Sequence, residues 1–465
     1  MTKHRVAKIV VLLLMCITAA LGASAQTFTT LVNFDQSNGG GARSLFQGID
    51  GNIYGIGGGG SNSGTAYFIT PDGAMTTLYS FCSKKNCADG VGPTGMVQAA
   101  NGNLFGTTYA GGANNGSGTV FELSPTGKLT TIYNFCAQTN CADGINPNSG
   151  LVQGIDGNFY GTTARGGAKN LGTVFVITPA GQFSTLYSFC SETNCDDGSS
   201  PYSGLVLATN GNLYGTTDYG GTNASGTIFE ITASGQFLSL YSLDVFNTLP
   251  STLIQAADGS FYGTTESMGS TGSVFRFIPP NNFTVLFTFC SGCAVGSNPV
   301  APVVQGSDGN FYGTTTMGGT RGDGTLFSMT PKGKLTVVHT FCTLTGCADG
   351  TEPAPLMQST NGIFYGSTGG GGEFGEGTLY SVSFGFAPFV ESNPVFGPAG
   401  RPVRILGNGL TGATSVAFNG TPATFKVVSD TYIQATVPAG ATTGTIVVTT
   451  PSGTLSSNVA FRIRP

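Results

Sequence analysis

Tryptophan is absent from the 465-residue sequence, and histidine occurs only twice. Charged residues make up 9% of the chain, whereas about 25% is usual in globular proteins. The formal net charge of −5 argues against a nucleic-acid-binding protein, which needs a clustered basic surface. A hydrophobic content of 40% argues against a disordered tail. The 74 glycines show no triplet period, which excludes collagen and indicates many tight turns between short strands.

The first 25 residues have the pattern of a secretory signal peptide. Lys3, Arg5 and Lys8 form a basic segment, an apolar run follows at 9–21, and small residues stand at 23–25. The run is too short for a comfortable membrane span, and no second long apolar stretch follows. Cys16 lacks the small preceding residue of a lipidation signal. We therefore predict cleavage before Gln26 and an exported mature chain, in the periplasm, at the cell surface or outside the cell, without membrane insertion.

An aromatic residue followed by glycine recurs seven times, which indicates an internal repeat. The glycines of these steps are Gly55, Gly106, Gly161, Gly215, Gly263, Gly313 and Gly366. They are spaced by 51, 55, 54, 48, 50 and 53 residues. In the unit at 147–195, apolar and β-branched runs predict strands at 151–153, 159–163, 173–177 and 183–189. Asp-Gly at 156–157 predicts a hairpin between the first two.

Four antiparallel strands repeated seven times are typical of a β-propeller. The seventh repeat stops after a third strand at 377–382, and a segment at 29–34 has the pattern of the missing fourth strand. Pairing these two segments would close the ring and remove an exposed sheet edge. The sequence therefore predicts an all-β, seven-bladed propeller over 26–385, closed by its N-terminal strand.

Three runs in the third repeat resemble the GloVer tandem-repeat family of secreted bacterial proteins. They are GLVQ at 150–153, DGNFYGTT at 156–163 and GTVF at 172–175. The resemblance extends over about 27–384 and implies an exported surface protein without a defined activity. The kelch pattern is a weaker match because its tryptophan is missing.

After residue 385 the repeat ends, and short strands with Gly and Pro turns continue to the C-terminus. The runs at 392–394, 397–400, 403–407, 416–420, 437–438 and 447–453 resemble an IPT/TIG domain. This resemblance implies an immunoglobulin-like β-sandwich over 386–465. Some such domains bind DNA, but the export signal and the acidic balance favour a spacer or adhesive module here.

Ten cysteines remain after removal of the leader, in five neighbouring pairs. The pairs are Cys82 with Cys87, Cys136 with Cys141, Cys190 with Cys195, Cys290 with Cys293, and Cys342 with Cys347. Each follows the fourth strand of a different blade, so we expect a disulfide within each loop. Zinc needs four converging ligands, and two cysteines per blade do not supply them. The spacing of Cys290 and Cys293 also fits a redox motif, but the pair stands at the same place in its repeat as the other four cysteine pairs.

Few residues offer catalytic chemistry. His339 is the only histidine of the mature chain and stands where other repeats have an aromatic residue, so we expect it to pack there and not to serve a catalytic triad. Two sets of aspartates recur in turns: Asp50, Asp156, Asp258 and Asp308 in hairpins, and Asp89, Asp143, Asp197 and Asp349 after the cysteine pairs. Capping of loops is the favoured role of the second set, and calcium binding is the alternative. We expect no cofactor and no metal ion.

Glutamines recur in the first strands and are absent only from the fourth repeat, where Leu207 stands. They are Gln47, Gln98, Gln153, Gln255, Gln305 and Gln358. First strands are innermost in a propeller, so these amides either line the channel or join blades by hydrogen bonds. The second role is favoured.

Alternating strand direction places the glycine-rich loops and the loops with the cysteine pairs, here called the stapled loops, on one face of the propeller. Long variable loops of this kind are suitable for recognition. Just after the Thr-Thr steps the repeats diverge, and this set forms the candidate binding site: Tyr109, Arg165, Asp218, Tyr219, Glu266 and Met317. We predict a non-enzymatic binding or scaffold protein that recognises glycans or surface partners there. The alternative is a propeller hydrolase or lyase acting on polysaccharide through carboxylates such as Asp218 and Glu266. Clustered carboxylates with perturbed pKa values would favour the enzyme.

Overall fold

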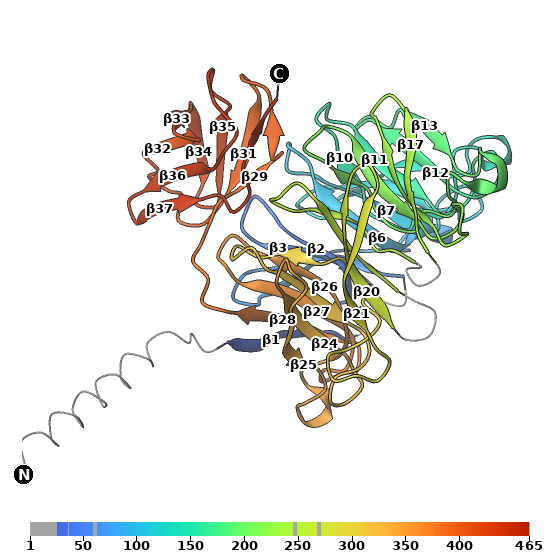
Figure 1. Cartoon of the computed structure of the whole chain (residues 1–465), viewed down its shortest axis with the longest axis horizontal. Coiled ribbons are helices and arrows are strands. Elements are labelled where there is room, and N and C mark those ends of the chain that lie inside the picture. The colour runs from blue at the N-terminus through green and yellow to red at the C-terminus, as the bar shows by residue number, and fades with distance from the viewer. Residues whose placement is uncertain (1–25, 36, 59–62, 245–248, 267–270, 465) are drawn as a thin grey trace, which may run out of the picture.

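A computed structural model describes residues 26–464 except 36, 59–62, 245–248 and 267–270. The predicted signal peptide and Cys16 therefore lie outside the described residues. Among those that are described, seven four-stranded antiparallel sheets form the blades of a propeller, followed by a C-terminal β-sandwich (Figure 1). The fold class predicted from the sequence is thereby confirmed.

The first six blades each use four consecutive strands. Blade 1 has β2 (Ala42–Gln47), β3 (Ile53–Gly57), β4 (Thr65–Ile69) and β5 (Met75–Ser80). Blade 2 has β6 (Val91–Gln98), β7 (Leu104–Ala110), β8 (Thr119–Leu123) and β9 (Leu129–Asn134). Blade 3 has β10 (Val152–Gln153), β11 (Phe159–Thr163), β12 (Thr173–Ile177) and β13 (Phe183–Ser188). Blade 4 has β14 (Val206–Leu207), β15 (Leu213–Thr217), β16 (Thr227–Ile231) and β17 (Phe237–Ser242). Blade 5 has β18 (Ile254–Gln255), β19 (Phe261–Thr265), β20 (Gly272–Ile278) and β21 (Asn282–Phe289). Blade 6 has β22 (Val304–Gln305), β23 (Phe311–Thr315), β24 (Thr325–Met329) and β25 (Leu335–Thr340).

Blade 7 joins the two ends of the propeller sequence. It contains β26 (Thr351–Gln358), β27 (Phe364–Gly370), β28 (Thr378–Ser383) and, as its outer strand, β1 (Thr27–Asn33). β1 pairs antiparallel with β28, with Thr27 opposite Ser383. The predicted closing strand is therefore present, and it leaves no free outer edge on β28.

The core lies between neighbouring blades and explains the aromatic-Gly step. In blade 3, Gly161 of β11 stands opposite Phe175 of β12. A Cβ atom on Gly161 would lie 2.6 Å from the Phe175 ring, so only glycine leaves room for this ring beside the strand. Phe175 in turn packs with Phe105 and Phe135 of blade 2. The glycine of the aromatic-Gly step thus makes room for one aromatic ring at each blade interface.

Short 3₁₀ turns follow the fourth strands of four blades. They are η1 (Lys85–Cys87), η2 (Thr139–Cys141), η3 (Thr193–Cys195) and η4 (Thr345–Cys347). Each ends at the second cysteine of its pair. The described residues contain no helix long and apolar enough to cross a membrane.

The C-terminal sandwich consists of two four-stranded sheets and one parallel strand pair. One sheet contains β29 (Glu391–Asn393), β31 (Pro402–Leu406), β35 (Tyr432–Thr436) and β34 (Phe425–Ser429). The other contains β33 (Thr421–Pro422), β32 (Ser415–Phe418), β36 (Ile446–Thr450) and β37 (Gly453–Ser456). The parallel pair is β30 (Phe396–Gly397) with β38 (Arg462–Ile463). The domain limits predicted at 25/26 and 385/386 stay predictions.

The sandwich docks on the propeller face that carries the first-to-second-strand turns, here called the hairpin face. Its side chains donate hydrogen bonds from Arg401 to the Ile155 carbonyl (3.0 Å), from Arg404 to the Gln98 carbonyl (2.9 Å), from Thr431 to the Ile49 carbonyl (2.7 Å), from Asn408 to Thr360 Oγ1 (2.8 Å), and from Arg464 to the Asn210 carbonyl. Five blades are contacted in this way. The sequence carries 21 acidic and ten basic residues at 26–385, but two acidic and five basic ones at 386–465, so the two parts are complementary in charge.

Candidate functional site

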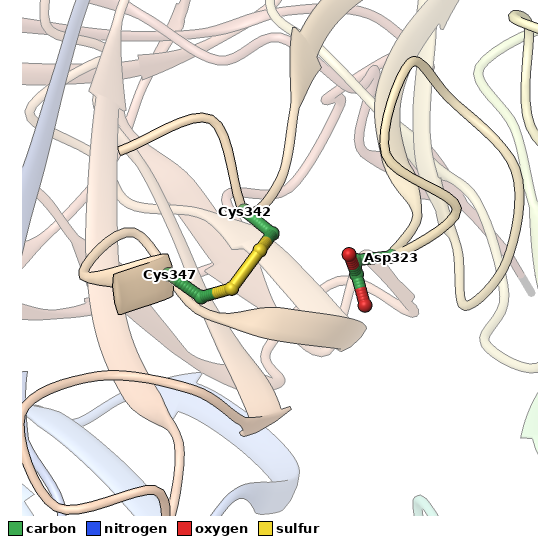
Figure 2. A group of neighbouring side chains, drawn as sticks. All are labelled: Asp323, Cys342 and Cys347. Atoms are coloured by element: carbon green, nitrogen blue, oxygen red, sulfur yellow. A yellow bond between two sulfur atoms is a disulfide. The ribbon is translucent and has the colours of Figure 1, made fainter. Parts of the chain in front are cut away.

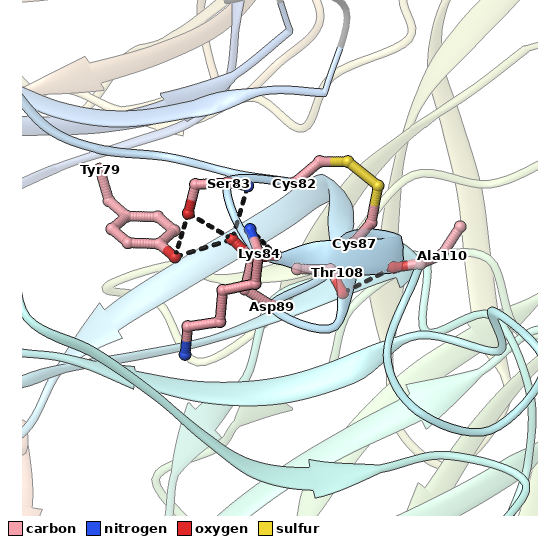
Figure 3. Close-up of a disulfide and its surroundings, with 8 residues drawn as sticks. All are labelled: Tyr79, Cys82, Ser83, Lys84, Cys87, Asp89, Thr108 and Ala110. Carbon is pink, nitrogen blue, oxygen red and sulfur yellow. Dashed lines mark hydrogen bonds between the residues drawn. A yellow bond between two sulfur atoms is a disulfide. The ribbon is translucent and has the colours of Figure 1, made fainter.

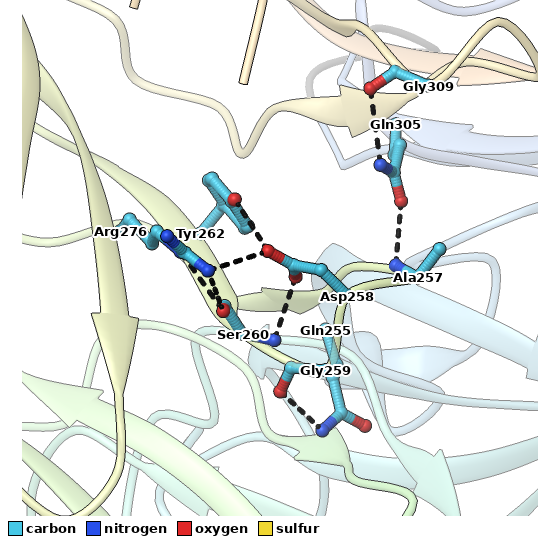
Figure 4. A network of polar contacts seen from close by, with 9 residues as sticks. All are labelled: Gln255, Ala257, Asp258, Gly259, Ser260, Tyr262, Arg276, Gln305 and Gly309. Carbon is cyan, nitrogen blue, oxygen red and sulfur yellow. Dashed lines mark hydrogen bonds and ion pairs between the residues drawn. The ribbon is translucent and has the colours of Figure 1, made fainter. Parts of the chain in front are cut away.

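The hairpin aspartates serve the turns that contain them. Asp258 accepts hydrogen bonds from the Ser260 backbone N–H (2.9 Å) and the Tyr262 hydroxyl (3.1 Å), and pairs with Arg276 at 2.9 Å (Figure 4). Asp156 and Asp308 likewise accept a bond from the tyrosine four residues later. These carboxylates are therefore engaged in local structure and are poor candidates for catalysis.

The glutamine series joins blades, as favoured from the sequence. Gln305 Oε1 accepts from the Ala257 N–H of the preceding blade at 2.8 Å, while its Nε2 donates to the Gly309 carbonyl of its own hairpin (Figure 4). Gln98, Gln255 and Gln358 repeat the bond to the preceding blade. Gln47 makes it across the seam between blades 7 and 1, accepting from Thr360 N–H at 2.8 Å. Five of the six amides therefore join neighbouring blades, while in the described residues the Gln153 side chain bonds only within its own hairpin.

The aspartates after the cysteine pairs cap the stapled loops. Asp89 is completely buried and accepts bonds from the Tyr79 hydroxyl (2.7 Å), the Ser83 backbone N–H (2.9 Å) and the Lys84 N–H (3.2 Å), beside the Cys82–Cys87 disulfide (Figure 3). Despite burial, these hydrogen bonds keep the pKa of Asp89 below its ordinary value. Asp143, Asp197 and Asp349 are equally buried and capped in the same way. Their oxygens are occupied by protein donors, which supports capping.

The five predicted cysteine pairs are all disulfides. The one group of three metal-type side chains in the described residues is Asp323 with Cys342 and Cys347 (Figure 2). Because the two sulfurs are bonded to each other, this group offers no thiolate for a metal ion.

His339 lies on β25 of blade 6, where blades 1 to 3 have a tyrosine that donates to the capping aspartate. Its Nε2 lies 3.1 Å from Asp349 Oδ2, and its ring stacks on Phe28 of β1 at 4.0 Å. Burial lowers the pKa of His339, although Asp349 acts in the opposite direction. The residue packs at the interface between blades 6 and 7, against the N-terminal strand that completes blade 7, as expected.

The six candidate residues lie on the face opposite the hairpin face, here called the loop face, in two structural positions. Arg165, Tyr219 and Met317 share an outer position, where each exchanges two backbone hydrogen bonds with a residue of the preceding loop: Ile145, Ser199 and Ser297. All three side chains are exposed. The same backbone scaffold therefore presents a different side chain to solvent in blades 3, 4 and 6.

Tyr109, Asp218 and Glu266 share the inner position directly after the Thr-Thr step, and all three are half-buried. Asp218 and Glu266 belong to adjacent blades and interact electrostatically. Burial, together with the negative charge of Glu266, raises the pKa of Asp218 to about 7. The structure thus brings these two carboxylates together, while the three outer residues are spread over blades 3, 4 and 6.

Sequence reasoning missed the covered hairpin face. Glu391 and Arg404 face a cavity there, although neither belongs to a recognisable motif. The available signal was the contrast in charge between the acidic repeats and the basic C-terminal segment.

Comparison with known families identifies both parts of the chain. Residues 58–251 and 193–380 match the Gloeobacter/Verrucomicrobia repeat, and residues 389–463 match the IPT/TIG domain. No curated protein matches the sequence significantly.

Two solved structures share the fold at low sequence identity. The extracellular domain of a hybrid two-component system from B. thetaiotaomicron is 11% identical with a TM-score of 0.52, covering 95% of this chain and 58% of its own. A fungal alcohol oxidase of the AA5 family, in complex with copper, is 13% identical with a TM-score of 0.51, covering 94% and 99%. This chain thus spans less than two thirds of the first. At such identities the likeness concerns the fold alone.

Proposed function

The chain belongs to the Gloeobacter/Verrucomicrobia repeat family. Because its repeats share one backbone structure but differ in the side chains that this structure exposes, we propose that it is an exported binding or scaffold protein. Its recognition surface is the loop face, and its partner is a glycan or a cell-surface protein. The observation that carries this proposal is the shared outer position of Arg165, Tyr219 and Met317.

Each outer residue offers a contact that glycan or protein recognition uses. Tyr219 and Met317 keep 45% and 46% of their surface exposed, although large apolar side chains are usually covered. A tyrosine ring can stack on the apolar face of a sugar, and the Arg165 guanidinium can donate to hydroxyl or carboxylate oxygens. A rigid blade holding a variable residue is how many binding folds separate recognition from stability.

The test compares loop-face variants with an equally exposed residue elsewhere. The mature protein is screened on a glycan array, and positive ligands are titrated against Tyr219→Ala and Arg165→Ala. Leu238→Ala is the matched control, because Leu238 is 56% exposed but lies on the outer strand β17. Binding hot spots are enriched in Tyr and Arg and cost more than about 1 kcal/mol when truncated, so we expect affinity losses of at least about fivefold. Equal affinity of all three variants and the parent protein would refute the loop-face assignment.

A second candidate function is polysaccharide hydrolysis or lysis at the inner position. The pKa of Asp218 near 7 is suitable for a general acid at neutral pH, and Glu266 is the neighbouring carboxylate. Reducing-sugar release from soluble polysaccharides tests it, with Asp218→Asn and Glu266→Gln as variants. Asp72→Asn, on the far face, is the control. Turnover that falls as pH rises through about 7 and disappears in both variants would establish the enzyme; the absence of turnover leaves the binding function.

A further inference from the structure

The docked sandwich and the first strands of the propeller line a cavity that is partly open to solvent, at the hairpin-side mouth of the propeller channel. It has a volume of about 410 Å³ and is lined by first-strand residues of blades 1, 2, 3, 6 and 7 and by β29 and β31. A second cavity of about 220 Å³ adjoins it and shares Val304, Gln358 and Glu391 in its lining. The volume of the first cavity is in the range that is typical of small-molecule sites.

Two opposite charges project into this cavity from neighbouring strands of the sandwich. Glu391 stands opposite Leu406, and Asn393 opposite Arg404, so Glu391 and Arg404 are diagonal neighbours on one sheet face. The alternate residues Ser392 and Ile405 point to the other side, where Ile405 joins the sandwich core. The register of β29 and β31 therefore aims both charged side chains at the channel.

Neither charge is neutralised by the other. Within the described part of the chain, Glu391 has no ion pair or hydrogen bond through its carboxylate, and Arg404 uses one N–H on the Gln98 carbonyl. Glu391 is solvent-exposed, and desolvation by the surrounding protein raises its carboxyl pKa. Burial also lowers the pKa of Arg404.

The walls around these charges are mainly aliphatic. They include Leu45, Met96, Val97, Leu151, Val304 and Leu356. The cavity glutamines Gln47, Gln98 and Gln358 already bond the hairpins and offer little to a ligand. The unused polar capacity is thus the carboxylate of Glu391, the side-chain amide of Asn393 and the remaining donors of Arg404.

We propose that this interdomain cavity binds a zwitterionic amino acid with an aliphatic side chain. The ammonium group is held by Glu391, the carboxylate by Arg404, and the side chain by the aliphatic wall. Charge-assisted hydrogen bonds at both ends are about twice as strong as neutral ones, which favours a zwitterion over a neutral sugar. The proposal concerns a different face from the loop-face site and does not depend on it.

Calorimetric titration of the mature protein tests the proposal with L-leucine and L-methionine as probes. Leucinamide lacks the carboxylate, 4-methylpentanoate lacks the ammonium group, and glucose represents neutral sugars. We expect saturable binding of both amino acids, and binding at least about tenfold weaker for each of the other three compounds. No heat of binding at about 10 mM amino acid, or equal binding of glucose, would overturn the proposal.

Two variants assign the site. Glu391→Gln removes a carboxylate without a protein partner, so the folded state is expected to keep its Tm while affinity falls at least about tenfold. Val304→Phe fills the cavity from a half-buried position and should abolish binding with Glu391 intact. Glu373→Gln, an exposed glutamate at the loop face, is the matched control and should bind like the parent protein. Unchanged affinity in Glu391→Gln would refute the assignment.

Discussion

The hydrogen bonds of Gln47 close the propeller ring, and replacing this residue by leucine tests how much they contribute. Gln47 is 8% exposed and accepts from the Thr360 N–H (2.8 Å) and the Ser359 hydroxyl (2.9 Å), while its Nε2 donates to Thr360 Oγ1 (2.9 Å). Leucine occupies the same position in blade 4, at Leu207, so its shape is compatible with a first strand. The change therefore mainly removes hydrogen bonds.

The expected cost follows from the number of bonds lost. A typical intramolecular hydrogen bond contributes about 0.5–1.5 kcal/mol, so three bonds correspond to about 1.5–4.5 kcal/mol. The matched control is Gln153→Leu, because in the described residues the Gln153 side chain donates only within its own hairpin, to Gly157 at 3.1 Å. We expect the control to cost about 1 kcal/mol.

Guanidinium unfolding monitored by circular dichroism measures both free energies of unfolding, with the disulfides intact. Amide hydrogen exchange at Thr360 provides a local readout, since its N–H loses its acceptor only in Gln47→Leu. If the two variants differ by less than about 0.5 kcal/mol and Thr360 exchanges at the parent rate, the amide bonds do not hold the seam.

The remaining predictions concern single blades. His339→Tyr should reduce the loss of Tm between about pH 7 and 5. Because the pKa of His339 is lowered in the folded state, the unfolded chain takes up the proton first on acidification, and stability falls through the ordinary pKa range of histidine. A tyrosine does not titrate in this range and cannot cause this loss. Equal pH profiles would contradict this. Tyr67→Phe and Tyr380→Phe should each be neutral or stabilising by up to about 1 kcal/mol in thermal unfolding, because both hydroxyls are buried and lack a partner among the described residues; a loss above about 1 kcal/mol would show that the hydroxyls are used. Asp143→Ala should destabilise by about 3–5 kcal/mol in denaturant unfolding, because it leaves the Tyr133 hydroxyl and two loop N–H groups without their buried charged acceptor; a cost below about 1 kcal/mol would refute the capping role.

The blade architecture could be derived from the sequence because its determinants are local and repeated. In blade 3, the strands predicted at 159–163 and 173–177 are β11 and β12 as observed, and the predicted fourth strand differs from β13 by one residue. Each determinant spans only a few residues: alternating burial, a hairpin turn or a pair of adjacent cysteines. Because the pattern occurs in seven copies, each strand prediction is supported by the other repeats. The closing strand was predictable because it is the missing member of an otherwise complete repeat.

The candidate site was only partly predictable. The divergence after the Thr-Thr steps identified the loop-face residues, but not their division into an exposed outer position and a half-buried inner one. That division depends on backbone bonds such as those between Arg165 and Ile145, which join separate loops. The raised pKa of Asp218 likewise depends on Glu266, which lies 48 residues away in the next blade.

By itself the sequence determined the number of blades, their strands, the disulfide pairs and the two-part organisation, since each is encoded in a short stretch of chain. Only the tertiary structure decided that the sandwich covers the hairpin face and aims Glu391 and Arg404 into the channel mouth. Docking of this kind depends on the complementarity of two whole surfaces in shape and in charge. A local pattern of residues therefore does not predict which surfaces will come into contact.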